Sequence, residues 1–106
     1  MKKILITRRL LRSCEDKAGK IFDAKFNYND ELHSQEKLIK LSEGCDGILS
    51  SLTDKLDAAT INKLPESIKI LSNFAVGFGN IDLDAAKKRN IIAVSYTHLR
   101  AHETSN

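Results

Sequence analysis

The chain is poor in the residues that build specialised small proteins. Its 106 residues include two cysteines, one proline and no tryptophan, and aromatic residues make up only 6%. Cys14 and Cys45 have no CxxC spacing and no paired histidine, so a metal site is not indicated. We interpret them as the reduced thiols of a cytoplasmic protein.

Long apolar runs and clusters of one charge sign are also missing. The start of the chain is similar to a signal peptide, but its apolar run stops at residues 7–9, and no stretch is long enough to span a membrane. The net charge of +3 is spread without an arginine-rich run, so nucleic-acid binding is not indicated. This mild basicity suits an anionic small substrate equally well. With 42% hydrophobic and 29% charged residues, the chain is typical of one small globular domain.

Short apolar runs alternate with helical patterns along the chain. We expect strands at 2–7, 21–28, 47–49, 68–74 and from 91, and helices at 9–20, 34–44, 53–65 and 80–90. This alternation predicts an α/β domain with a parallel, five-stranded, flavodoxin-like sheet in the order 2-1-3-4-5 and helices on both faces.

Residues with capping preferences mark the expected ends of these helices. Gly19 and Gly44 are expected to end the first and second helices. Ser34 is expected to cap the second, Ser51 or Thr53 the third, and Asn80 or Asp82 the fourth, because short polar side chains satisfy free amides at helix starts.

In open parallel sheets, ligands bind beyond the carboxyl ends of the strands. Residues 7–9, 50–53 and 72–80 occupy three such ends, and "SNFAVGFGN" at 72–80 is the most unusual of them. Its glycines allow a tight turn whose amides could hold an anion at the start of the next helix. An ordinary βα loop, in which glycine only relieves strain, remains the alternative on spacing alone. The turn is not a dinucleotide fingerprint, because a third glycine is missing.

The other polar residues at these ends suggest less. Ser50, Ser51 and Thr53 have no histidine nearby in sequence that would make a serine nucleophilic. Arg8 and Arg9 could face an anion, but we expect them to be solvated. We also expect His33 to be exposed to solvent.

The segments "KILITRRLL" and "CDGILSSLTDKLDAATINKLPESIKILSNFAVGFGNIDLDAAKKRNI" resemble the amino-terminal substrate-binding domain of the D-isomer-specific 2-hydroxyacid dehydrogenases. The glyoxylate and hydroxypyruvate reductase branch is the most similar, from about Lys3 to Ala93. The resemblance implies that the backbone amides of Val76 and Gly77 hold the carboxylate of a 2-oxoacid. It also implies that Leu52 and Ala75 line the same pocket.

The resemblance further implies hydride transfer from NADH or NADPH to glyoxylate or hydroxypyruvate. In that family, the cofactor and the catalytic arginine, glutamate and histidine belong to a nucleotide-binding domain that is not in this sequence. We therefore expect no catalytic, cofactor-binding or metal-binding residue here, and an inactive fragment of an enzyme that is a homodimer at full length. A stand-alone flavodoxin-like binding or signalling module is the alternative. A receiver domain, one such module, would need acidic residues after the first strand and an aspartate for phosphorylation after the third, but residues 7–9 and 50–51 are Thr-Arg-Arg and Ser-Ser.

The end of the chain, "VSYTHLRAHETSN", is a separate question. Residues 94–104 resemble one translated frame of a sequencing-library adapter, and the family resemblance stops where they begin. We therefore expect a domain fragment at 1–93 and a foreign tail at 94–106. The rival interpretation is a metal pair of His98 and His102, whose i, i+4 spacing suits a helix.

Overall fold

The computed structural model describes residues 2–9, 12–51, 53–74 and 80–95. Within these residues, strands and helices alternate as the sequence predicts. The elements are β1 (Lys3–Ile6), α1 (Arg12–Ile21), β2 (Asp23–Lys25), α2 (Gln35–Leu41), β3 (Gly47–Ser51), α3 (Ala58–Lys63), β4 (Ile70–Phe74), α4 (Leu83–Lys88) and β5 (Ile92–Ser95).

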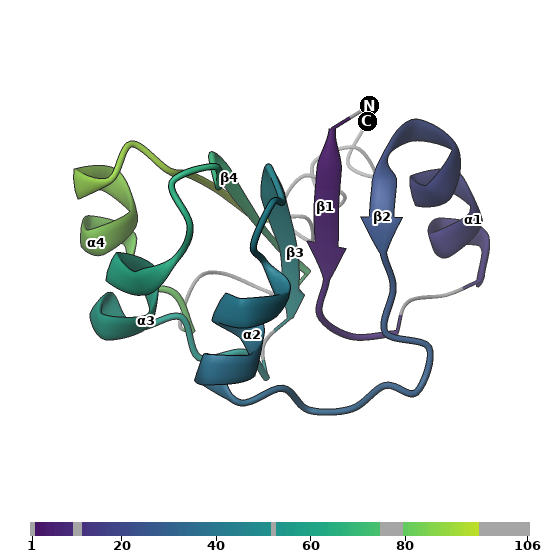
Figure 1. Cartoon of the computed structure of the whole chain (residues 1–106), viewed down its shortest axis with the longest axis horizontal. Coiled ribbons are helices and arrows are strands. Elements are labelled where there is room, and N and C mark those ends of the chain that lie inside the picture. Colours follow the sequence, from purple (N-terminus) through teal and green to yellow (C-terminus); the bar gives the residue numbers. More distant parts are fainter. Residues whose placement is uncertain (1, 10–11, 52, 75–79, 96–106) are drawn as a thin grey trace, which may run out of the picture.

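The strands form one parallel sheet in the order β2-β1-β3-β4-β5, which confirms the predicted flavodoxin-like topology. The connection through α1 runs along the sheet in one direction, and those through α2, α3 and α4 run in the other. Because parallel crossovers are right-handed, this reversal places α1 on one face and the other helices on the opposite face. Figure 1 shows α1 beside β2, while α2, α3 and α4 gather at the other side.

The hydrophobic core lies between the sheet and helices α2 to α4. Leu5, Ile48 and Leu71 are neighbours in register on β1, β3 and β4, and each is at most 3% exposed. Leu38 from α2 and Ile61 from α3 pack onto the same cluster. Burying one such side chain contributes about 1.5–3 kcal/mol, so this layer holds the carboxyl ends of the strands in place.

The opposite face of the sheet is less covered in the described part of the chain. Ile70 and Ile92 are paired in register on β4 and β5, yet they are 38% and 64% exposed. The contacts of α1 are with β2, at the far edge of the sheet. An apolar surface therefore remains open over β4 and β5.

The predicted start of the second helix is confirmed, whereas α2 ends at Leu41 with Ser42 as its C-cap, two residues before the predicted Gly44. The hydroxyl of Ser34 accepts a hydrogen bond from the Lys37 amide at 3.1 Å and caps α2. Gly44 follows the helix with a φ of +79°, a left-handed conformation that glycine adopts without the strain a side chain brings.

The predicted end of the first helix is wrong. Helix α1 continues through Gly19 to Ile21, and the ring of Phe26 lies 3.6 Å from where a Cβ of Gly19 would stand. That distance is an ordinary van der Waals contact, so Gly19 is an interior residue of α1 and does not end the helix.

The predicted start of the third helix is also wrong. Helix α3 begins after Asp57, whose carboxylate accepts from the Thr60 amide at 2.9 Å. The chain before α3 turns at residues 53–54, and Leu56 then forms an isolated parallel bridge with Ile81. Of the two caps predicted for the fourth helix, Asp82 is the one observed, and it accepts from the Ala85 amide at 3.1 Å.

A helix that spans a membrane needs about 20 predominantly apolar residues. No helix in the described ranges has that length and character; α1, for instance, has 10 residues.

Candidate functional site

The carboxyl ends of β1, β3 and β4 lie side by side at one edge of the sheet, because the three strands are parallel neighbours. Among the described residues, the segments that follow β1 and β3 meet there through Thr7, Ser51 and Asp54. Leu52, Ala75, Val76 and Gly77, the residues predicted to contact a 2-oxoacid, lie outside the described residues, so their roles stay predictions. The described residues around them define the frame of the site.

A buried carboxylate joins the ends of β1 and β3. Asp54 is 2% exposed, and its Oδ2 accepts hydrogen bonds from the Thr7 hydroxyl and, at 2.9 Å, from the Ser51 amide. Thr7 itself is fully buried. Because a buried charge is costly without partners, these bonds hold the two strand ends at a fixed separation.

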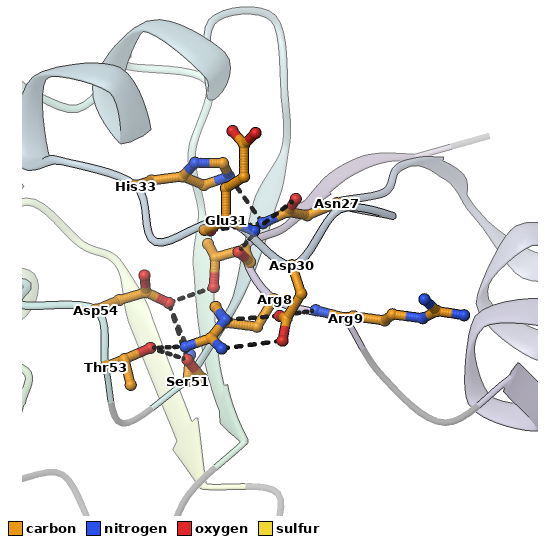
Figure 2. Close-up of polar contacts among 10 residues, drawn as sticks. Arg8, Arg9, Asn27, Asp30, Glu31, His33, Ser51, Thr53 and Asp54 are labelled. Carbon is orange, nitrogen blue, oxygen red and sulfur yellow. Dashed lines mark hydrogen bonds and ion pairs between the residues drawn. The ribbon is translucent and has the colours of Figure 1, made fainter.

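Arg8 ties a third segment to this edge, as Figure 2 shows. Its guanidinium donates from Nε to Asp30 Oδ1 at 2.7 Å, from Nη2 to Asp30 Oδ2 at 3.0 Å, and from Nη1 to Thr53 Oγ1 at 2.9 Å. The hydrogen bond from Arg8, aided by the Arg9 amide, lowers the pKa of Asp30 from 3.8 to about 2. The same bond raises the pKa of Arg8. The expectation of two solvated arginines is thus wrong for Arg8, while Arg9 is exposed.

Asn27 organises the loop after β2, and the sequence analysis missed it. Its Nδ2 donates to the carbonyls of Thr7 and Glu31, both at 2.8 Å, and it lies 3.3 Å from Nε2 of His33. His33 is half-buried, and its Nδ1 is buried with no hydrogen-bond partner in the described structure. The prediction of a solvent-exposed His33 is therefore wrong. Asn27, Asn29 and Asp30 are residues that favour turns, and their clustering could have indicated this loop.

The hydroxyl cluster after β3 is engaged in structural bonds. Ser50 donates to Asn73 Oδ1 at 3.1 Å, and the hydroxyls of Ser51 and Thr53 are 2.9 Å apart. Among the described residues, no hydrogen bond links these hydroxyls to His33, which lies against Asn27. The Ser51 hydroxyl donates to Asp54 Oδ2 at 3.4 Å, but that oxygen already accepts from the Ser51 amide and the Thr7 hydroxyl, so this carboxylate is engaged in structural bonds.

Metal binding finds no support in the described part of the chain, where no three His, Cys, Asp or Glu side chains gather into a ligand set. His98 and His102, the predicted rival pair, lie outside that part.

Comparison with known families assigns the chain. The profile of the family "D-isomer specific 2-hydroxyacid dehydrogenase, catalytic domain" matches residues 4–105, and the chain belongs to this family. The glycerate dehydrogenase of Hyphomicrobium methylovorum is 34% identical over 90 residues, which are 85% of this chain and 28% of that protein. The glyoxylate reductase of Korarchaeum cryptofilum (strain OPF8) is 29% identical over 89 residues, 84% of this chain and 26% of that protein.

Solved structures agree on the fold. A D-isomer specific 2-hydroxyacid dehydrogenase from Polaromonas sp. JS6 66 superposes with a TM-score of 0.84 at 24% identity, covering 88% of this chain and 29% of that one. The D-lactate dehydrogenase of Escherichia coli gives a TM-score of 0.73 at 22% identity, covering 90% and 30%. The chain thus spans under a third of the length of each of these four relatives.

Proposed function

We propose that this chain is the 2-oxoacid-binding part of an enzyme that reduces glyoxylate or hydroxypyruvate to a D-2-hydroxyacid. The observation that carries the proposal is the family match over residues 4–105, supported by relatives named glycerate dehydrogenase and glyoxylate reductase. The location agrees with it, since the carboxyl edge of a parallel sheet is where such folds bind ligands.

In this proposal the substrate is held mainly by backbone groups. The amides of Val76 and Gly77 bind the carboxylate, and Leu52 and Ala75 line the pocket. Amides in a tight turn form a concavity with positive potential, so a carboxylate is bound without a charged side chain. The contribution of this chain is to bind and orient the oxoacid, which lowers the entropic part of the barrier.

A nicotinamide cofactor, NADH or NADPH, would supply the hydride. The residues here do not fit a dinucleotide, because the sequence has no G-x-G-x-x-G run. The turns after β1, β2 and β3 also contain no glycine. We therefore assign the cofactor, the proton donor and the homodimer contacts to a separate domain, and expect no turnover from this chain alone. A cytoplasmic location is part of the same proposal.

Residues 94–106 are proposed to be foreign to the enzyme because of their likeness to adapter sequence. Two observations weigh against a boundary at residue 93: β5 extends through Ser95, and the family match runs to residue 105. Sequencing the genomic DNA from an independent library tests the proposal. An independent library whose genomic DNA encodes the same residues 94–106 would contradict the proposal. A different coding sequence after the Ala93 codon would support it.

A chimera tests the function. Residues 4–93 replace the aligned segment of the Hyphomicrobium glycerate dehydrogenase, and NADH oxidation is measured with glyoxylate and hydroxypyruvate. The proposal predicts turnover that depends on the oxoacid, and none from the chain alone with NADH or NADPH. A folded chimera that binds NADH but reduces neither oxoacid would refute the substrate assignment.

A further inference from the structure

We propose that the side chains of Asn73 and Asn80 form an asparagine clamp that positions the two segments of the oxoacid site relative to each other. The inference rests on the proposed function and deepens it. It assigns a positioning role to Asn73 and Asn80, whereas the proposed contacts with the oxoacid are made by Leu52 and residues 75–77.

The two side-chain amides pair with each other across the base of one loop. Asn73 Nδ2 donates to Asn80 Oδ1 at 2.9 Å, and Asn80 Nδ2 lies 3.2 Å from Asn73 Oδ1. Asn73 is fully buried in β4, and Asn80 is half-buried before α4. The residues are seven apart in sequence, so the pair holds together the two ends of the segment that contains Val76 and Gly77.

The same amide of Asn80 reaches a second loop. Its Nδ2 donates to the carbonyls of Ser51 and Asp54, both at 2.9 Å. Those two residues stand on either side of Leu52. Asn80 Nδ2 carries two hydrogens and has three acceptor oxygens within reach, on Ser51, Asp54 and Asn73. One of its hydrogens is therefore shared between two acceptors.

Backbone bonds reinforce this junction. The Leu56 amide donates to the Asn80 carbonyl at 2.8 Å, and the Asp82 amide donates to the Leu56 carbonyl at 2.9 Å. The segment after β3 is therefore bound to the segment before α4 by both main chain and side chain.

Asparagine suits this place because its short side chain ends in both a donor and an acceptor. Aspartate keeps the shape but loses the donors, and serine is too short to replace the whole amide. Helix capping does not account for Asn80, because Asp82 caps α4. The hydroxyl of Ser50 donates to Asn73 Oδ1 at 3.1 Å and orients the other half of the pair.

The clamp matters for binding because Leu52 and the amides of Val76 and Gly77 must face one ligand at the same time. Small displacements between groups that bind one substrate are costly, and precise sites depend on bonds that support them from behind. Asn73 and Asn80 supply such bonds between β4, the loop after β3 and the start of α4.

Amide hydrogen exchange by NMR, on the whole chain without ligand, tests the clamp. The variants are Asn80→Ser and Asn80→Asp. We expect exchange at Leu52 and at residues 75–79 to accelerate on the order of tenfold, while the core amides of Ile48 and Leu71 change little.

A control at the amino ends of the strands distinguishes a local positioning effect of the clamp from a general loss of stability. Ser67 donates to the Cys45 carbonyl at 2.6 Å, and so links the segments before β3 and β4. The variant Ser67→Ala removes one comparable bond. It is expected to leave exchange at residues 52 and 75–79 unchanged relative to the core.

Equal acceleration at core and loop amides in both Asn80 variants would overturn the clamp, and so would no acceleration. A titration with glyoxylate provides the second readout, with affinity expected to fall on the order of tenfold in the variants. If the unaltered chain bound no glyoxylate while the exchange pattern held, the proposed function would fail and the clamp would stand.

Discussion

Arg8 and Asp30 form a two-point ion pair that fastens the end of β1 to the loop after β2. Nε and Nη2 of the guanidinium donate to the two carboxylate oxygens at 2.7 and 3.0 Å, and a third nitrogen reaches Thr53. Since exposed ion pairs are screened, the value of this one lies in its paired geometry and in joining three segments at the candidate site.

The ion pair of Arg8 and Asp30 makes the folding stability of the chain depend on pH. The pKa of Asp30 is about 2 in the folded chain and 3.8 as the reference for an unfolded one, so the folded state favours the charged carboxylate. Its contribution is present above about pH 4 and is lost as the pH falls towards 2. In thermal melts from pH 6 to pH 2, the melting temperature of Asp30→Asn should be lower than that of the unaltered chain at pH 6. The two melting temperatures should converge as the pH falls towards 2. Exposed Glu43→Gln should follow the unaltered chain, and a constant gap for Asp30→Asn would contradict this assignment.

The bond from the Thr7 hydroxyl to buried Asp54 should be important for stability. Thr7→Val keeps the shape but removes the donor to a charged group, which should cost about 1.5–3 kcal/mol of unfolding free energy. Urea unfolding measures this loss. Ser13→Ala on the exposed side of α1 is the control, and a loss for Thr7→Val below about 0.5 kcal/mol would contradict the assignment.

The two thiols should react at different rates. Cys45 is fully buried, and burial raises its pKa, whereas Cys14 is half-buried on α1. Because the thiolate is the reactive form, iodoacetamide should modify Cys14 first in the native chain, and both equally in denaturant. Peptide mass spectrometry reads the order, and equal native rates would show that Cys45 is accessible.

The open apolar face over β4 and β5 should promote self-association. Ile92 is 64% exposed beside Ile70, and exposed apolar patches drive aggregation. Ile92→Lys should reduce concentration-dependent light scattering, and Lys88→Gln on α4 should not. Unchanged scattering for Ile92→Lys would place the association surface elsewhere.

The strand order could be predicted because it follows from local patterns, whereas the site residues Leu52, Ala75, Val76 and Gly77 stay predictions. Apolar runs that alternate with amphipathic stretches define a parallel sheet, and its carboxyl edge follows from topology. The pair of Arg8 and Asp30 could not be predicted, because the partners are 22 residues apart and meet only through tertiary packing.

Asn80 illustrates the same limit. Before a helix, an asparagine is a reasonable N-cap, so local chemistry allowed two candidates for one position. Asp82 is the N-cap because the bridge between Leu56 and Ile81 fixes the chain before α4. The side-chain amide of Asn80 then lies against the Ser51 and Asp54 carbonyls and is not free to cap the helix. Contacts between distant segments decide such cases.

The central claim is that the turn at Val76 and Gly77 binds the carboxylate of a 2-oxoacid. A titration of the ¹⁵N-labelled chain with glyoxylate, followed by amide chemical shifts, tests it most directly, with glycolaldehyde as the matched control that lacks the carboxylate. The account predicts saturable shifts centred on the amides of Val76 and Gly77 with glyoxylate alone. No saturable shift at these amides, or equal shifts with glycolaldehyde, would contradict it.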